Sequence, residues 1–144
     1  MNLQDKLRAA QQQKIEAEKE KGRTFLSQNK LRAEVKELDN GIQYEIIKEA
    51  DGPKPSLSNT IKAHYKGSLL DGKEFDSSYK RNQPFSAKLT SLIKGWQEVI
   101  PLMTVGSIWK LWIPSELAYG DRGAGTIPPG ATLIFEIELL EIIN

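Results

Sequence analysis

The spacing of apolar residues changes near residue 40, and this change limits what the chain can fold into. Residues 1–36 contain no proline and a single glycine, Gly22, and they are rich in good helix formers such as Ala, Gln, Glu, Lys and Leu. After the turn signal Asp39-Asn40-Gly41, apolar and polar residues alternate at every second position. We therefore expect a helical stalk and linker at residues 1–40 and a β-rich domain at residues 41–144.

The first segment predicts one long helix that ends near Asn29. Opposite charges stand four residues apart in it, as in Lys14 and Glu18. Its apolar residues are Leu3, Leu7, Ile15, Phe25 and Leu26. This stripe is too thin for a buried helix and too irregular for a sustained coiled coil. We expect a free-standing, solvated stalk with Phe25 and Leu26 docking its end, and pairing with a partner helix is the alternative.

The second segment predicts strands with one apolar and one polar face, which is typical of an antiparallel sheet. The alternating runs cover residues 42–47, 61–66, 109–113 and 133–139. His64 shares the polar face of its run with two lysines, so we expect it at the solvent. In the third run, Trp109 is expected in the core and Trp112 outside.

One short helix interrupts these strands. Trp96, Val99, Ile100 and Met103 recur at helical spacing, so this helix should bury one face against the sheet. Pro101 should end it early, because proline removes a backbone donor and clashes one turn back. The predicted fold class is α+β, a twisted antiparallel sheet wrapped around one short helix and preceded by a long N-terminal helix.

Composition removes most of the usual catalytic groups. The chain has no cysteine and one histidine, which excludes disulfides and thiol nucleophiles and makes a histidine metal site or a Ser-His-Asp triad improbable. Twenty Lys and Arg against nineteen Asp and Glu leave a net charge of +1, which argues against a dedicated nucleic-acid binder. An enzyme with this composition must use simple chemistry.

Targeting signals are also absent from the sequence. No apolar run approaches the roughly 18 residues of a membrane helix, and the first residues lack the apolar core of a secretory signal. We expect a cytoplasmic protein without a membrane partner, and a periplasmic or cell-surface protein is the alternative if a leader has been removed.

Motifs in a fixed order point to a known family. They are His64-Tyr65-Lys66-Gly67, residues 70–78 (LDGKEFDSS), Leu92-Ile93-Lys94-Gly95-Trp96, Leu117-Ala118-Tyr119-Gly120 and residues 127–135 (IPPGATLIF). Together they strongly resemble the FKBP family of peptidyl-prolyl isomerases across roughly residues 42–142. Residues 22–30 resemble the end of the connecting helix in bacterial proteins of the Mip and FkpA type. Those proteins normally carry an N-terminal dimerisation domain before that helix, and we expect that domain to be missing here.

The resemblance implies an active site, which we carry over residue by residue. The implied catalytic residues are Tyr65, Asp76, Tyr119 and Phe135. The implied substrate-binding residues are Phe75, Phe85, Leu92, Ile93, Trp96 and Ile127. Trp96 would form the floor under a proline ring, the Ile93 amide and the Tyr119 hydroxyl would bind substrate carbonyls, and Asp76 would bond to Tyr65. The loop of residues 121–126 is one residue shorter than expected of such proteins, so its contacts with the pocket stay open.

The implied reaction suits a chain with so few reactive groups. Twisting an Xaa-Pro amide must overcome a barrier of about 20 kcal/mol, and a dry aromatic cleft favours the twisted form without a metal, cofactor or nucleophile. The expected partners are proline-containing unfolded chains and rapamycin-like macrolides, with the protein a monomer or a weak dimer through its N-terminal helix. A chaperone-like binding module with little turnover, and a client-holding role for the helix, are the alternatives.

Overall fold

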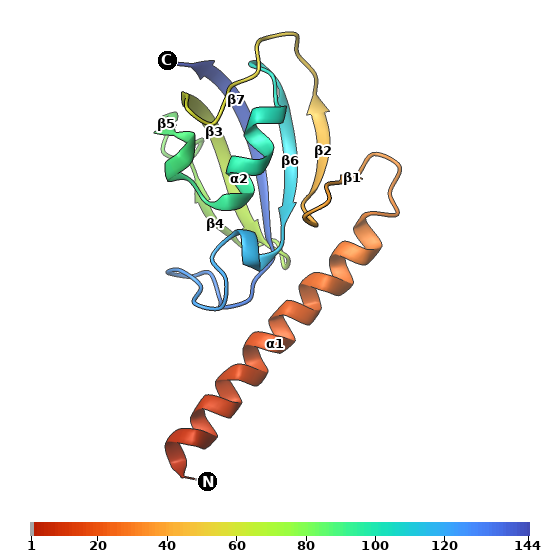
Figure 1. Cartoon of the computed structure of the whole chain (residues 1–144), viewed down its shortest axis with the longest axis vertical. Helices are drawn as coiled ribbons and strands as arrows, with labels where there is room; N and C mark the ends of the chain where they lie inside the picture. Colours follow the sequence, from red (N-terminus) through yellow and green to blue (C-terminus); the bar gives the residue numbers. More distant parts are fainter. Residues whose placement is uncertain (1) are drawn as a thin grey trace.

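The computed structural model describes residues 2–144 and has the expected α+β architecture (Figure 1). The helices are α1 (Leu3–Asn29) and α2 (Lys94–Val99), with short 3-10 turns η1 (Leu89–Ser91), η2 (Ile100–Leu102) and η3 (Ser115–Leu117). The strands are β1 (Lys36–Glu37), β2 (Gln43–Lys48), β3 (Thr60–Leu69), β4 (Glu74–Ser77), β5 (Phe85–Lys88), β6 (Ile108–Ile113) and β7 (Leu133–Ile142).

The strands form one antiparallel sheet in the order β1-β2-β6-β7-β3-β4, with β5 also paired to β3. Each alternating run of the sequence contributes a strand, because its apolar face has a core to enter. In β7 the residues that face this core are buried and the glutamates between them lie on the other face. The long central strands β3 and β7 together contribute seven of the 18 buried residues of the hydrophobic core.

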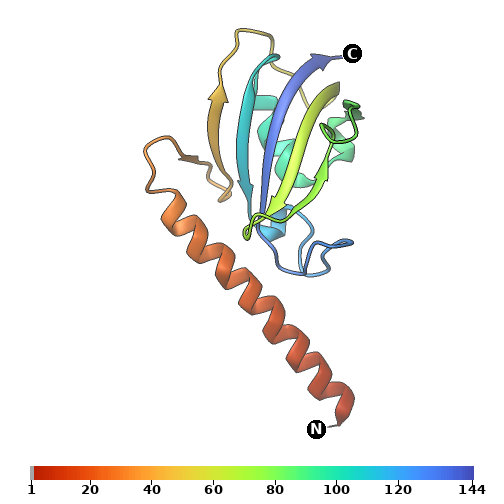
Figure 2. The same ribbon diagram turned by 180° about the vertical axis from the view of Figure 1, so that it is seen from behind.

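Helix α2 lies across one face of the sheet. In Figure 2, which views the molecule from behind, the strands lie in front of this helix. Trp96, Val99, Ile100 and Met103 are buried against the strands, as their spacing predicts. The helix ends at Val99 and continues as the 3-10 turn η2, which contains Pro101. The prediction that Pro101 ends this helix early is confirmed.

The expectation of a free-standing N-terminal stalk is wrong. Residues 2–14 are exposed and project beyond the rest of the chain, but the following half of α1 packs on the domain (Figure 1). The buried positions are Ile15, Gly22 and Asn29, each seven residues after the last and so on one face of the helix. Phe25 and Leu26 are only half-buried. A search for an apolar stripe misses this face because two of its three buried residues are a glycine and an asparagine.

A buried pair of amides fastens the end of α1 to the sheet. Gln43 lies on the expected polar face of its strand, yet it is 0% exposed. Its side-chain oxygen accepts a hydrogen bond from Asn29 Nδ2 at 2.9 Å, and its Nε2 donates to the Leu26 carbonyl at 2.9 Å and to Glu37 at 3.0 Å. Polar groups here replace the apolar contact that the sequence suggested.

Trp112 is also covered, although it faces away from the core. It pairs with Gln43 and Ile134 on the neighbouring strands and is 1% exposed. The Arg32 guanidinium carbon lies 5.8 Å from the ring centroid and the Lys110 Nζ lies 5.4 Å from it. The predicted direction of this side chain is right, whereas its expected contact with solvent is wrong.

Across residues 2–144, every helix is too short or too polar to span a membrane.

Candidate active site

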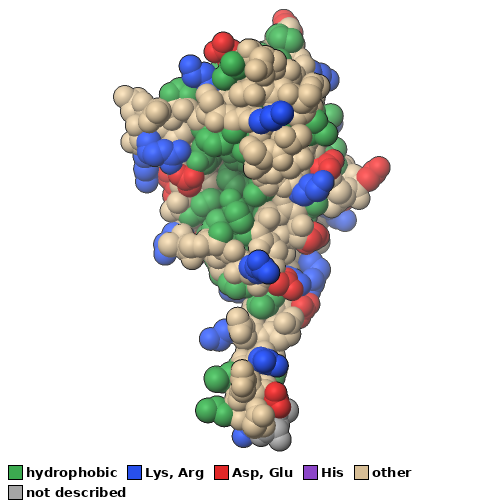
Figure 3. All heavy atoms as spheres, turned by 60° about the vertical axis from the view of Figure 1, so that its left-hand side comes forward, with side chains coloured by type: hydrophobic (Ala, Val, Ile, Leu, Met, Phe, Trp, Pro, Cys, Tyr) green, Lys and Arg blue, Asp and Glu red, His purple; other side chains and the backbone are tan. Residues whose placement is uncertain are grey.

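One cleft gathers nine of the ten site residues expected from the sequence. It has a volume of about 350 Å³, and Figure 3 shows a hollow lined with hydrophobic side chains, with charged side chains at one edge. Its lining residues are Tyr65, Phe75, Asp76, Phe85, Ser91, Leu92, Ile93, Trp96, Tyr119 and Phe135. They come from β3, β4, β5, β7, α2 and the segments beside η1 and η3, so only the complete fold assembles the cleft.

A larger groove of about 620 Å³ lies between α1 and the loops after β6 and before β7. Its lining includes three cationic side chains and three anionic ones: Lys19, Arg23, Lys30, Glu37, Glu116 and Asp121. Such a surface suits water and ions better than an apolar ring, so the smaller cleft is the candidate site.

Trp96 forms the centre of the aromatic cleft. Its ring makes edge-to-face contacts with Tyr65 and Phe135 at 5.2 Å and with Phe85 at 6.0 Å between centroids. The indole is 5% exposed, and its buried Nε1 has no hydrogen-bond partner among residues 2–144. Edge-to-face contacts with these three rings hold the indole in place and give the cleft a rigid apolar floor.

A glycine on β3 explains how the side walls fit together. A Cβ at Gly67 would lie 2.5 Å from Phe75 Cζ and 2.8 Å from Phe135 Cε1. These two rings meet edge to face at 5.7 Å, directly over the glycine. The motif His64-Tyr65-Lys66-Gly67 therefore places a cleft tyrosine beside the one residue small enough to admit both phenyl rings.

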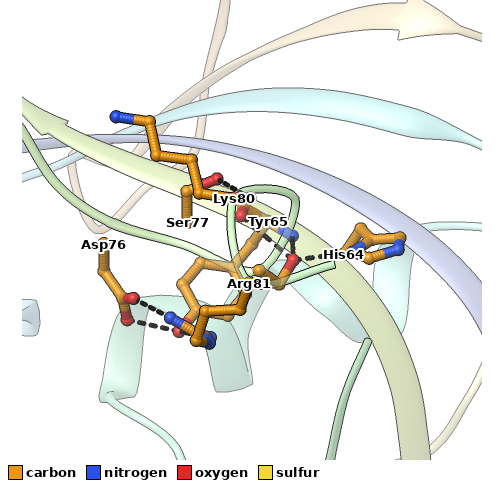
Figure 4. A network of polar contacts seen from close by, with 7 residues as sticks. His64, Tyr65, Asp76, Ser77, Lys80 and Arg81 are labelled. Carbon is orange, nitrogen blue, oxygen red and sulfur yellow. Dashed lines mark hydrogen bonds and ion pairs between the residues drawn. The ribbon is translucent and has the colours of Figure 1, made fainter. Parts of the chain in front are cut away.

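The polar wall of the cleft is a network of three side chains (Figure 4). The Tyr65 hydroxyl donates a hydrogen bond to one Asp76 oxygen, and Arg81 donates to the other. Arg81 Nη2 also donates to the Tyr65 hydroxyl at 3.1 Å. The expected bond between Asp76 and Tyr65 is present, and each carboxylate oxygen has its own donor.

This network sets the protonation of its members. Burial raises the pKa of Tyr65, and the hydrogen bond that it donates to Asp76 raises it further. Burial also acts to raise the pKa of Asp76, but the hydrogen bonds from Tyr65 and Arg81 outweigh it and hold this pKa below its ordinary value. Asp76 is therefore a carboxylate at neutral pH and Tyr65 a neutral phenol.

Arg81 is the site residue that sequence reasoning missed. It lies in the loop between β4 and β5, where no apolar period marks it, and it precedes Asn82, whose φ is +53°. Ser78 ties this loop to β3, because its backbone N–H donates to the Tyr65 carbonyl at 2.9 Å and its Oγ accepts from the Tyr65 N–H at 2.7 Å. The only available signal was the Asp-Ser-Ser sequence, which is typical of such side-chain to backbone turns.

His64 lies behind this loop rather than in open solvent. Its ring stacks on Tyr79 at 4.6 Å, and its Nδ1 lies 2.8 Å from Ser78 Oγ. The side chain is half-buried, so its predicted exposure is only partly correct. Within residues 2–144 no group of three or more His, Cys, Asp or Glu residues is arranged to hold a metal ion.

Two hydrogen-bond donors belong to residues that line the cleft and have no partners among residues 2–144. The Ile93 backbone N–H immediately precedes α2 and donates no backbone hydrogen bond in this range. The Tyr119 hydroxyl has no partner in this range either, and the residue is 38% exposed. An extended peptide in the cleft would meet an apolar floor and two free donors.

Ile127 is the one predicted residue that does not line the cleft. It is 7% exposed and packs in the hydrophobic core, where its backbone pairs with Ala124. Ile127 therefore belongs to the hydrophobic core rather than to the lining of the cleft.

Known proteins share this architecture. Residues 52–140 match the family described as FKBP-type peptidyl-prolyl cis-trans isomerase, and residues 1–46 match the family described as the domain amino terminal to it. The expectation that this N-terminal domain is missing is therefore wrong, because α1 and its linker belong to it.

Individual proteins with related names also resemble this chain. The chain is 45% identical to the peptidyl-prolyl cis-trans isomerase Mip of Coxiella burnetii, over 85% of this chain and 54% of that protein. It is 41% identical to the FKBP-type 22 kDa peptidyl-prolyl cis-trans isomerase of Escherichia coli, over 98% of this chain and 69% of that protein. The crystal structure of FkpA from Escherichia coli superposes with a TM-score of 0.90 at 38% identity, over 94% of this chain and 63% of that one. The chain thus spans about half the length of the Coxiella protein.

Proposed function

Because this chain belongs to the FKBP-type peptidyl-prolyl cis-trans isomerase family, we propose that it accelerates the isomerisation of Xaa-Pro bonds in polypeptides. The observation that carries the proposal is the convergence of nine of the ten expected site residues on one aromatic cleft, two of which offer donors without partners among residues 2–144. The cleft volume of about 350 Å³ falls within the range of small-molecule and peptide pockets, roughly 300–1,000 Å³.

The floor of the cleft acts on the ground state of the amide. A planar Xaa-Pro amide carries a large dipole that water stabilises, and the twisted transition state has lost amide resonance and part of that dipole. A proline ring resting on Trp96, between Phe85 and Phe135, removes this water. The planar form then loses more stabilisation than the twisted form, so the barrier falls.

The two donors hold the chain on either side of the reacting bond. The Ile93 amide binds one substrate carbonyl and the Tyr119 hydroxyl binds another, which keeps the flanking peptide bent while the bond between them rotates. Each hydrogen bond that forms better in the twisted state lowers the barrier, and about 1.4 kcal/mol gives a tenfold gain in rate. No covalent bond is made or broken.

Asp76 works through position and charge rather than as a base. Both of its oxygens accept hydrogen bonds, one from Tyr65 and one from Arg81, so neither is free to take a proton from substrate. Its lowered pKa keeps it ionised. The carboxylate therefore fixes the Tyr65 ring as a wall of the cleft and supplies a negative charge beside the bond that twists.

The test is an NMR exchange assay on a short Xaa-Pro peptide, with a rapamycin-like macrolide as competitor. Trp96→Leu should lower kcat/KM about tenfold or more, because it removes the floor. Trp112→Leu is the matched control, since it removes an equally buried indole from the opposite face of the sheet and should leave kcat/KM of the folded protein within twofold. Peptide binding without exchange in the native chain would favour the binding module, and equal rates for the two variants would refute the site.

The exposed end of α1 fits a role in assembly. Leu3 and Leu7 are 72% and 61% exposed and four residues apart, so they lie on one face beyond the domain. We propose that the chain is a monomer that forms a weak dimer through this end. Light scattering across a concentration series should show a mass increase in the native chain and none after Leu3→Ser with Leu7→Ser, and a constant native mass would contradict the dimer.

A further inference from the structure

We infer that helix α1 positions the cleft residue Tyr119, with Lys19 and Gly22 as the positioning residues. This inference rests on the proposed isomerase function, since it assigns to two helix residues an effect on that reaction. Neither residue touches the cleft, and both contact the segment between η3 and β7 that carries Tyr119.

The first contact is a close approach of the helix backbone at Gly22 to the side chain of Thr132. A Cβ at Gly22 would lie 2.1 Å from Thr132 Oγ1 and 3.1 Å from Thr132 Cβ, so glycine lets the helix lie at this depth without moving Thr132. Thr132 is 4% exposed and directly precedes β7. A larger side chain at position 22 must push α1 outward or turn Thr132.

The second contact is one to two turns earlier on the same face of the helix. A Cβ at Gly130 would lie 2.8 Å from the Ile15 carbonyl oxygen and 3.2 Å from Lys19 Cγ. Lys19 Nζ forms an ion pair with Asp121 Oδ1 at 2.8 Å, and this hydrogen bond raises the pKa of Lys19. The helix therefore touches both ends of the loop that spans residues 120–131.

Backbone hydrogen bonds join these two ends at the base of the loop, next to Tyr119. The Gly130 N–H donates to the Gly120 carbonyl at 2.9 Å, and the Gly120 N–H donates to the Ser115 carbonyl at 2.8 Å. The Gly123 N–H donates to the Tyr119 carbonyl at 3.2 Å. A shift of the helix surface against Gly130 is thus passed through a single hydrogen bond to the residue that follows Tyr119.

Tyr119 depends on this support more than the other tyrosine of the cleft does. Tyr65 is held by Asp76 and Arg81 through its hydroxyl. The Tyr119 side chain has no hydrogen bond among residues 2–144, so its hydroxyl is positioned by its backbone and by the packing of its ring, without a hydrogen-bond partner. Whatever fixes that backbone fixes the donor offered to substrate.

The experiment compares helix variants in two backgrounds. Lys19→Gln should lower kcat/KM on a short Xaa-Pro peptide about two- to fivefold, as expected for one exposed ion pair. Gly22→Leu should lower it by up to about tenfold, and by no more than Tyr119→Phe does, because both act on one hydrogen bond. Arg23→Gln is the matched control, since within residues 2–144 Arg23 pairs only with Glu16 and Glu20 of its own helix.

The decisive readout is the Tyr119→Phe background. If the helix acts through the Tyr119 hydroxyl, Lys19→Gln and Gly22→Leu should each change kcat/KM less than twofold there, whereas a general loss of folding would persist. Undiminished effects in that background would overturn the inference. Should Gly22→Leu fail to fold, Lys19→Gln alone decides.

A second readout separates this inference from the proposed function. In ¹H–¹⁵N spectra of the full chain, Lys19→Gln should shift the amide signals of Tyr119 and Gly120, and Arg23→Gln should leave them in place. An inactive native chain would refute the isomerase proposal and leave this result standing. Unmoved Tyr119 and Gly120 signals in an active enzyme would refute the positioning role.

Discussion

Replacing Gln43 with leucine should loosen the end of α1 from the sheet. Gln43 is completely buried and bonds to Asn29 Nδ2 and to the Leu26 carbonyl, both at 2.9 Å. Leucine fills a similar space but offers no acceptor. The Asn29 amide, on a residue that is 6% exposed, then loses the partner that satisfies it.

The size of the effect follows from what each partner retains. An orphaned buried donor costs roughly 1–3 kcal/mol, and the lost bond to the Leu26 carbonyl costs about 1 kcal/mol. The Leu26 carbonyl still accepts a hydrogen bond from the Lys30 N–H at 3.1 Å, and Glu37 is exposed enough to bind water. Neither group is therefore left without a hydrogen-bond partner. Burial of the leucine side chain offsets part of this loss. We expect a net loss of about 2 kcal/mol in the free energy that holds the end of α1 in place.

The assay is amide hydrogen exchange on the native chain and its variants. A loss of about 2 kcal/mol should speed exchange of the amides of residues 22–29 roughly 30-fold, while β3 and β7 remain protected. Gln28→Leu is the control, because Gln28 is exposed one residue away on the same helix.

The double variant Asn29→Ala with Gln43→Leu provides the critical comparison. It removes both members of the buried pair, so it should recover much of the lost protection. Unchanged exchange in Gln43→Leu, or a double variant as labile as the sum of the single ones, would refute the reasoning.

Three further predictions concern the cleft. Arg81→Gln should raise the pKa of Asp76 toward its ordinary value, measured by NMR titration of the carboxyl group. Because the folded-state pKa of Asp76 is depressed, its stabilising contribution is present above about pH 4 and is lost as the pH falls, so the native chain should exceed this variant in stability at pH 7 and converge with it in acid. Gly67→Ala should cost about 1–3 kcal/mol in urea unfolding and lower kcat/KM, because its Cβ would meet two phenyl rings; unchanged values would contradict the packing. Tyr119→Phe should lower kcat/KM about two- to tenfold with the melting temperature unchanged, since its hydroxyl has no partner among residues 2–144, and an unaltered rate would remove it from the site.

The fold was predictable where burial follows a simple period. The runs at residues 61–66 and 133–139 alternate cleanly because each strand has one face on the core and one face on solvent or charged neighbours. Pro101 ended the short helix for a local reason, the missing backbone donor. Both kinds of signal depend only on neighbouring residues.

The contacts of α1 could not be predicted in this way. They depend on a glycine that allows close approach, an ion pair and a buried amide pair, and none of these adds to an apolar stripe. Trp112 is covered by residues distant in sequence, so its alternation gave the right face and the wrong exposure. Arg81 enters the site because a loop folds back on β3, which only the tertiary structure shows.

The order of strands has a consequence for how the chain is made. Strand β7 lies between β6 and β3 in the middle of the sheet, yet it is the last of the described strands to be synthesised. Until it emerges from the ribosome, β3 and β6 have open edges and the wall of the cleft lacks Phe135. We therefore expect the domain to remain a substrate for holding chaperones throughout translation and to close in one late step, so that a nascent chain stalled before residue 133 has no isomerase activity.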